Sequence, residues 1–424
     1  MGDTDTGATR ALVLHPDITS DHTRRDAAFA IQEAVSLAVA LPGLEVIDAV
    51  TVRLSKPTPG TLFGSGKVEE LGQRIKAEDI GLVLIDGPVT PVQQRNLERE
   101  WKTKLLDRTG LILEIFSDRA ATREGVLQVE MAALTYQRTR LVRAWTHLER
   151  QRGGLGFVGG PGETQIEADR RAIDEQLTRL RRQLEKVVKT RTLHRAARAK
   201  VPFPVVALVG YTNAGKSTLF NRLTGADVVA KDMLFATLDP TMRAIKLSTG
   251  REVILSDTVG FISDLPTQLV AAFRATLEEV LEADLILHVR DISHPETEAQ
   301  SANVMGILSE LGVKEDTPQI EIWNKTDALD ADDRAAREAE AARKDNVMAI
   351  SALTGAGVEA LVQSVTDVLD RDRQIATLKI DHADGKRRAW AYEQGIVVSE
   401  TRSDDGLELE VNWTPLQAER FSRL

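Results

Sequence analysis

The chain has 424 residues, 42% of them hydrophobic and 28% charged, which is ordinary for a globular protein and long enough for several domains. It contains no cysteine, which excludes disulfides, thiolate metal sites and cysteine nucleophiles and fits a reducing cytoplasm. No run approaches the ~20 apolar residues of a membrane-spanning helix, and the polar start MGDTDTGATR is unlike a signal peptide. We therefore expect a cytoplasmic protein without stable membrane insertion.

Charge is distributed unevenly along the chain. The whole carries 54 − 64 = −10, but residues 119–200 contain 18 Lys/Arg against 9 Asp/Glu, which is +9. Such an asymmetry favours contact between this segment and a polyanion, although a solvated helical face is the simpler alternative.

Residues 1–118 are expected to form an N-terminal α/β domain. Short apolar runs alternate with helical patterns, which favours a largely parallel sheet. The expected strands are 11–15, 46–52, 82–85 and 111–116, and the expected helices are 24–41, 68–76 and 91–101.

Residues 119–200 predict an antiparallel helical hairpin. Apolar residues recur with 4-3 spacing in both halves, which makes a narrow seam suited to a helical partner. The seam positions are Leu127, Met131, Leu134, Leu141, Trp145 and Leu148, then Ile166, Ile173, Leu177, Leu180, Leu184 and Val187, with Arg138 and Arg170 filling the gaps. Between them the glycines of RGGLGFVGGPGE (152–163) interrupt the helix, so we expect a hairpin about 45 Å long with a glycine-rich tip.

Residues 201–373 carry a phosphate-binding pattern. The apolar run Val205–Val209 leads into GYTNAGKS (210–217) and a helical segment, the strand–loop–helix context that this motif requires. Lys216 should reach the β- and γ-phosphates, and the Ser217 hydroxyl should ligate Mg²⁺. The expected nucleotide-binding residues here are Gly210, Tyr211, Thr212, Asn213, Ala214, Gly215, Lys216, Ser217 and Thr218.

Three further motifs follow in the order typical of a guanine-nucleotide site. Asp257 of DTVG can hold Mg²⁺ through water, and the Gly260 N–H can contact the γ-phosphate. The carboxylate of Asp327, in NKTD, can accept both N–H donors of guanine, which adenine lacks. A backbone N–H of Ser351-Ala352-Leu353 can meet guanine O6. These motifs add Asp257, Thr258, Val259, Gly260, Asn324, Lys325, Thr326, Asp327, Ser351, Ala352 and Leu353 to the expected site.

The segment FATLDPT (235–241) is expected to respond to the γ-phosphate. A threonine here would complete Mg²⁺ coordination, and we favour Thr237 over Thr241. Its neighbours Phe235, Ala236, Leu238 and Asp239 are expected to line the nucleotide. We expect Lys216, Thr237 and Gly260 to be the catalytic residues.

Phe261 stands where Ras-like enzymes keep a glutamine that orients water, and a phenyl ring can do no such work. We infer slow intrinsic hydrolysis of GTP to GDP, with a partner completing the site.

Two remaining segments carry weaker signals. FGSGKVEEL (63–71) looks like a phosphate loop but has Val68 after Lys67, so we interpret it mainly as a helix start, with a second anion site as the alternative. Residues 374–424, with IVVSE, an Asp404-Asp405-Gly406 turn and LELEVNW, predict a small β-rich domain.

Taken together, these motifs resemble the HflX family of GTPases over nearly the whole chain. The residues that carry the resemblance are GSGKVEEL, LILEIFSDRA, LQVEMAALTY, HLERQRGGLG, GPGETQIEADRR and LFATLDPT. It implies binding to the large ribosomal subunit, the glycine-rich tip approaching the peptidyl transferase centre, and rescue or splitting of stalled ribosomes. One departure is Val158-Gly159, where the family often has an arginine just before GPGE.

Two other classes of function remain open from the residues alone. One is an RNA-remodelling NTPase that also uses ATP at the N-terminal domain, and the broken motif at Gly64–Lys67 weakens it. The other is a nucleotide-gated interaction protein in which hydrolysis is incidental. We expect a monomer.

Overall fold

The computed structural model describes residues 8–21, 25–151, 161–198, 203–226, 234–238, 241–263, 278–314, 316–371, 373–381, 384–403 and 406–422. These residues divide into two compact units. The first comprises the described residues of Met1–Val187 and of Lys231–Asp239. The second comprises those of Val188–Ala230, Pro240–Ser263 and Ala275–Leu424.

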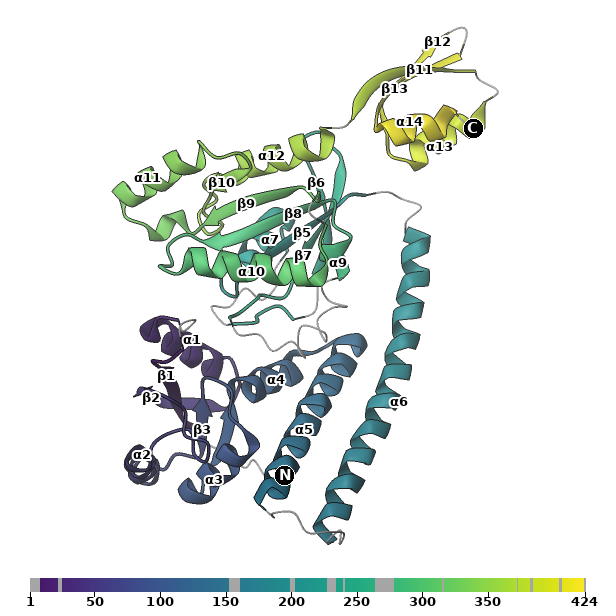
Figure 1. Ribbon diagram of the computed structural model, residues 1–424. Helices are drawn as coiled ribbons and strands as arrows, with labels where there is room; N and C mark the ends of the chain where they lie inside the picture. Colours follow the sequence, from purple (N-terminus) through teal and green to yellow (C-terminus); the bar gives the residue numbers. More distant parts are fainter. Residues whose placement is uncertain are drawn as a thin grey trace, which may run out of the picture. The chain divides into compact units, whose positions relative to one another are not determined.

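The first unit contains the expected parallel sheet, and its strand order is β2-β1-β3-β4 (Figure 1). Strand β3 is buried throughout and β1 is buried from Ala11 to Leu14, which explains the continuous apolar runs at these positions in the sequence. The strands are β1 (Thr9–Ile18), β2 (Leu44–Leu54), β3 (Leu82–Ile85) and β4 (Lys104–Asp107), and the helices are α1 (Ala27–Val39), α2 (Ser65–Ala77), α3 (Pro91–Trp101) and α4 (Arg108–Arg119).

The expected strand at residues 111–116 is wrong, because this segment lies inside helix α4. The last strand of the sheet is β4, which ends at Asp107. The Asp107 side chain accepts a hydrogen bond from the Gly110 N–H at 2.8 Å and so caps the N-terminus of α4. Leu111, Ile112 and Phe116 are all buried. Only Glu114 of this six-residue run is exposed, and one exposed position does not separate a strand from a helix.

The helical hairpin is confirmed as α5 (Arg123–Gln151) and α6 (Pro161–Arg198). The helices are neighbours, since Gln176 donates to Glu130 at 3.0 Å and Arg138 pairs with Asp174 at 3.0 Å. The seam residues Leu127, Leu177 and Leu180 are buried. The glycine-rich tip 152–160 lies outside the described residues, as do the side chains of Trp145, Leu148 and Ile166.

The second unit contains the expected second α/β sheet, with the order β10-β9-β8-β5-β7-β6. All neighbours are parallel except β6 and β7. The carboxyl ends of the parallel strands meet at one edge, which is where ligands bind in such folds. The strands are β5 (Val205–Gly210), β6 (Thr241–Lys246), β7 (Glu252–Asp257), β8 (Leu285–Asp291), β9 (Gln319–Asn324) and β10 (Val347–Ala349). The helices are α7 (Lys216–Thr224), α9 (Glu278–Leu281), α10 (Thr297–Leu311), the 3₁₀ turn η1 (Thr326–Ala328), α11 (Ala331–Ala341) and α12 (Val358–Asp370).

The C-terminal residues form the expected small β-rich part. Three antiparallel strands have the order β11-β13-β12 and pack against two helices (Figure 1). Every second residue of β13 is buried, from Leu407 to Trp413, as one covered face of a sheet requires. The elements are β11 (Gln374–Ile380), α13 (Gly385–Glu393), β12 (Val397–Ser403), β13 (Gly406–Trp413) and α14 (Pro415–Ser422).

Candidate functional site

The phosphate loop joins β5 to α7 at the carboxyl edge of the second sheet. Lys216 opens α7, and its side chain is buried beneath the loop. Its ammonium donates to the carbonyl oxygens of Gly210 at 3.1 Å and Tyr211 at 2.8 Å. An ammonium has three N–H donors, so one is left over by its bonds to the described residues. Burial lowers the pKa of Lys216 to about 8. A desolvated cation with a spare donor is what a phosphate group would complement.

Beside it, Ser217 and Asp257 form a pair of oxygen ligands. The Ser217 hydroxyl donates to Asp257 Oδ2 at 2.8 Å, and Asp257 is fully buried at the end of β7. Hydroxyl and carboxylate oxygens are the ligands that Mg²⁺ prefers, and it usually takes only one or two from the protein. The donor set therefore fits the magnesium ion expected from the sequence.

Asn324 ties the phosphate loop to the base-reading motifs. Its side-chain Nδ2 donates to the Ala214 carbonyl at 2.8 Å, and its Oδ1 accepts the Ala352 N–H at 2.9 Å. A Cβ at Gly215 would lie 2.2 Å from Asn324 Nδ2, and Gly215 also has φ +93°, so only glycine fits there. The phosphate loop, the NKTD motif and the Ser351-Ala352-Leu353 segment are thus joined by the side-chain amide of Asn324.

Asp327 is held in place by hydrogen bonds to its side chain and to the backbone beside it. Its carboxylate accepts the Ser351 hydroxyl, and Arg334 donates to the carbonyls of Thr326 at 2.8 Å and Asp327 at 3.3 Å. Lys325 pairs with Asp291 at 2.7 Å at the end of β8. The Ser351 hydroxyl bonds to Oδ1, one of the two carboxylate oxygens of Asp327.

The segment Leu234–Leu238, which contains Thr237, groups with the first unit rather than with the phosphate loop. The Phe235 ring packs edge-on against Phe116 of α4 at 4.7 Å between centroids. Arg119 donates to the Leu234 carbonyl at 2.7 Å, to the Phe235 carbonyl, and to the Ala40 carbonyl at 2.8 Å. Thr237 is buried. Sequence reasoning missed Arg119 because its acceptors are backbone atoms, which leave no mark in the sequence.

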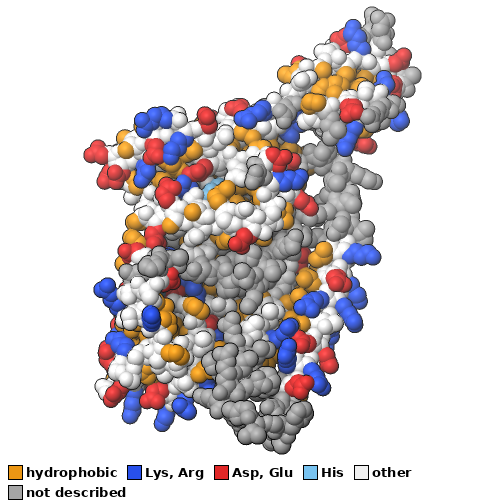
Figure 2. All heavy atoms as spheres, viewed as in Figure 1, with side chains coloured by type: hydrophobic (Ala, Val, Ile, Leu, Met, Phe, Trp, Pro, Cys, Tyr) orange, Lys and Arg blue, Asp and Glu red, His pale blue; other side chains and the backbone are white. Residues whose placement is uncertain are grey.

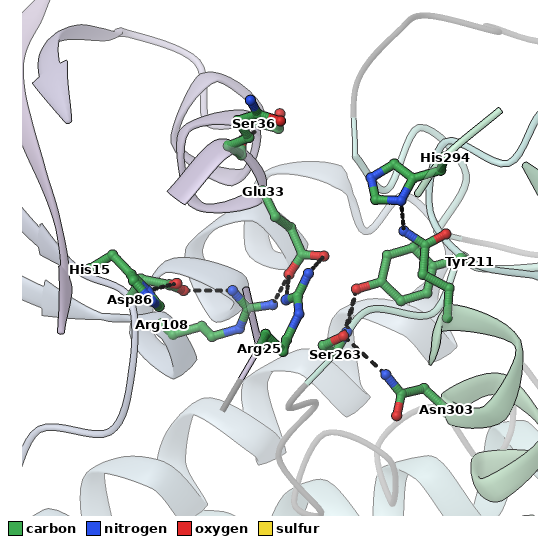
Figure 3. A network of polar contacts seen from close by, with 12 residues as sticks. His15, Arg25, Glu33, Ser36, Asp86, Arg108, Tyr211, Ser263, His294 and Asn303 are labelled. Carbon is green, nitrogen blue, oxygen red and sulfur yellow. Dashed lines mark hydrogen bonds and ion pairs between the residues drawn. The ribbon is translucent and has the colours of Figure 1, made fainter. Parts of the chain in front are cut away.

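Phe261 is buried, with an exposed fraction of 1%. Its backbone pairs with Tyr211 of the phosphate loop, and the Tyr211 hydroxyl bonds to Ser263 two residues further along (Figure 3). Neither contact was expected from the sequence, because the partners are separated by about 50 positions and carry no motif. Thr241, the alternative to Thr237, is the first residue of β6.

The phosphate-loop look-alike at residues 63–71 is the start of helix α2, as interpreted from the sequence. Lys67 pairs with Glu70 at 2.6 Å on the surface of this helix. Elsewhere in the first unit, Arg108 bridges Asp86 and Glu33 (Figure 3). Burial alone would lower the pKa of Arg108, but the two carboxylates raise it. Its charge is thus balanced within the protein.

Four families match consecutive stretches of the chain. Their descriptions are GTP-binding GTPase N-terminal (residues 29–117), GTP-binding GTPase Middle Region (119–198), 50S ribosome-binding GTPase (205–325) and HflX C-terminal domain (336–424). Among the described residues, no helix is long and apolar enough to cross a membrane.

Full-length relatives match over almost the entire chain. GTPase HflX of Magnetococcus marinus is 49% identical over 98% of this chain and 95% of its own length. GTPase HflX of Escherichia coli is 44% identical over 94% of this chain and 91% of its own length. A solved GTP-binding protein from Sulfolobus solfataricus in complex with GDP covers 86% of this chain and 99% of its own, with 23% identity and a TM-score of 0.46.

The sheet, the phosphate loop and the base-reading edge together define a P-loop GTPase, an enzyme that binds and hydrolyses GTP. Within that class, the chain belongs to the HflX family of GTPases.

Proposed function

We propose that the protein is a Mg²⁺-dependent GTP hydrolase that binds the large ribosomal subunit and acts in rescue or splitting of stalled ribosomes. The GTP-bound state favours association, and hydrolysis to GDP favours release. The observation that carries the nucleotide part is the Asn324 amide, which joins the phosphate loop to the guanine-reading strand ends. We also propose that the chain has four domains, at residues 1–118, 119–200, 201–373 and 374–424.

Each motif has a role in the proposed site. Lys216 neutralises the β- and γ-phosphates with its remaining donor, and Asp327 accepts the guanine N–H groups. Ser217 and Thr237, with Asp257 through water, would hold Mg²⁺, which neutralises charge on the phosphates. The bound nucleotide contacts the residues at 210–218, 235–239, 257–260, 324–327 and 351–353.

The buried ring of Phe261 supports slow turnover in isolation. A phenyl ring has no group that donates or accepts a hydrogen bond, so it cannot orient a water molecule. We therefore assign completion of the site to the ribosome, which would supply or order the missing group.

The hairpin provides the proposed contact with ribosomal RNA. The described part of α6 exposes a row of cations between Arg170 and Lys189, and Lys and Arg side chains are visible along this helix in Figure 2. They are Arg170, Arg171, Arg179, Arg181, Arg182, Lys186 and Lys189. Neutralisation of phosphates by such residues makes binding salt-dependent. The family description of residues 205–325 as a 50S ribosome-binding GTPase supports the large subunit as the partner. We propose that a monomer binds it in the cytoplasm.

The test is GTP turnover by the full chain, alone and with purified large ribosomal subunits, at two salt concentrations. We expect strong stimulation that weakens as salt rises, because several phosphate contacts would be lost together. No stimulation, with GTP binding intact, would leave a GTPase whose partner is not the large subunit.

Two variants separate the hairpin from the nucleotide site. Deletion of residues 153–162 should spare turnover of the free protein but remove the stimulation. Arg181→Glu with Arg182→Glu should act in the same direction, whereas Arg95→Glu with Arg99→Glu, exposed on α3, serves as the matched control. Retained stimulation in the deletion variant would refute the role of the tip.

A further inference from the structure

Tyr211, the second residue of the phosphate loop, extends away from the loop towards the segment that follows Gly260. Its ring is 5% exposed, and its hydroxyl accepts the Ser263 N–H at 2.8 Å while sharing a second hydrogen bond with Ser263 Oγ at 2.8 Å. Asn303 of α10 donates to the same Ser263 Oγ at 3.1 Å (Figure 3). A phosphate loop needs no side chain at this position, because its backbone N–H groups bind phosphate. This tyrosine therefore has another task.

The backbone reinforces the same connection. The Thr212 N–H donates to the Phe261 carbonyl at 2.7 Å, and the Phe261 N–H donates to the Gly210 carbonyl at 3.2 Å. Phe261 and Ile262 are both 1% exposed. The three residues after Gly260 are thus fixed to the phosphate loop by two backbone bonds and by the Tyr211 hydroxyl.

This connection determines where Gly260 lies. A Cβ at Gly260 would be 2.7 Å from Thr212 Cγ2, 2.8 Å from Thr212 Cα and 3.1 Å from Lys216 Nζ. Even a methyl group would collide with the loop backbone, so the site requires glycine there. The Gly260 backbone is therefore held directly beside the ammonium assigned to the β- and γ-phosphates.

We propose that Tyr211 is a positioning residue that presets Gly260 to meet the γ-phosphate and thereby helps the protein to distinguish GTP from GDP. The inference rests on the proposed roles of Lys216 and Gly260. GDP lacks the γ-phosphate, so its binding does not depend on where Gly260 lies. A merely structural role for Tyr211 in the loop would instead affect both nucleotides equally.

The test is Tyr211→Phe, which removes the hydroxyl and keeps the buried ring. We expect GTP affinity and kcat/KM to fall roughly 3- to 10-fold, the loss expected for one or two hydrogen bonds, with GDP affinity unchanged. Asn303→Ala, at an exposed position, should move the GTP-to-GDP ratio in the same direction by less. Tyr392→Phe is the matched control, because it removes a half-exposed hydroxyl that binds Glu400 in the C-terminal part.

The readout is the ratio of GTP to GDP affinity, measured by displacement of a fluorescent GDP, beside steady-state GTP turnover. An unchanged ratio in both Tyr211→Phe and Asn303→Ala would overturn the positioning role, as would an equal loss for both nucleotides. Failure of the wild-type protein to bind GTP would refute the proposed nucleotide site itself. That outcome is separate from a failure of the positioning role, because it is seen without any substitution at Tyr211.

Discussion

The two ends of the nucleotide site differ in how far their hydrogen bonding is already complete. At the base end, the Asn324 amide and the Asp327 carboxylate are each bonded to neighbours within the same unit. At the phosphate end, Lys216 is a buried cation whose pKa is lowered to about 8. The segment Leu234–Leu238, proposed to respond to the γ-phosphate, belongs to the other compact unit.

This difference separates recognition from response. A base end whose side chains are already hydrogen-bonded would read guanine equally well in GTP and GDP, which share that base. The phosphate end, with the buried ammonium of Lys216, is where the presence of a γ-phosphate would shift a conformational equilibrium. Substitutions at the base end should therefore change which base is bound. Substitutions at residues that hold Leu234–Leu238 or the residues after Gly260 should change how the protein responds to the γ-phosphate.

The largest expected effect is at the base end, from Asp327→Asn. Guanine would lose the acceptor for its two N–H groups, whereas the carbonyl of xanthine would gain a donor. A site built to hydrogen-bond its ligand rejects a mismatch strongly, so we expect GTP affinity to fall on the order of 1,000-fold and xanthosine triphosphate to be preferred. Competition of each nucleotide against a fluorescent GDP measures this.

Asp330→Asn is the matched control for that change. Asp330 is exposed three residues away and caps α11 by accepting the Asp333 N–H at 2.8 Å, a role that asparagine also fills. Its nucleotide preference should equal that of the wild type. Guanine selectivity that survives in Asp327→Asn would show that another group reads the base.

The motifs at both ends could be located in the sequence because each of them is local. The phosphate loop, Asp257, Asn324–Asp327 and Ser351–Leu353 all follow strands at short range, so their meeting at one sheet edge follows from the parallel fold.

The hydrogen bonds that hold Leu234–Leu238 and the residues after Gly260 in place were not predictable in this way. Tyr211 and Ser263 are 52 positions apart, and Arg119 binds backbone carbonyls 115 and 116 positions away. Such contacts depend on tertiary placement and have no periodicity. The error at residues 111–116 has a local cause: five of the six residues are buried and apolar, and so short a run, broken only by the exposed Glu114, fits a strand as well as a helix.

The next effect in size is expected from Arg119→Ala, which tests the anchor of Leu234–Leu238. The guanidinium donates to the carbonyls of Leu234 and Phe235, and burial lowers its pKa, so it is partly desolvated. Two hydrogen bonds from a charged donor are worth about 3 kcal/mol, so amide hydrogen exchange over residues 234–238 should accelerate roughly 100-fold. Hydrogen-exchange mass spectrometry measures it directly.

Arg119→Lys sharpens that test, because it keeps the charge but loses the planar fork that reaches several carbonyls. It should give an intermediate rate of exchange. Arg99→Ala, exposed on α3, should leave the rate unchanged. Unaltered exchange over residues 234–238 in Arg119→Ala would mean that the Phe116–Phe235 contact holds this segment without the arginine.

The smallest expected effect concerns His288, which lies on β8 between the strands that lead to the two ends of the site. It is opposite Val209 of β5 and Glu321 of β9, and is 4% exposed. Burial lowers its pKa to about 4 from an ordinary 6.5. The unfolded chain therefore binds a proton below pH 6.5, whereas the folded protein does not until about pH 4. The free energy of unfolding must accordingly fall as the pH drops through this window.

Between pH 7 and pH 5 the loss should be about 2 kcal/mol, since each pKa unit corresponds to about 1.4 kcal/mol. His288→Gln keeps a polar side chain that cannot take up a proton, so it should remove this part of the pH dependence. Urea unfolding of both proteins at the two pH values measures it. His288 lies on β8 opposite Val209 and Glu321, outside the four motifs, and we expect the GTP-to-GDP ratio to stay constant. A changed ratio would mean that the two ends communicate through β8, and the separation of recognition from response would then fail.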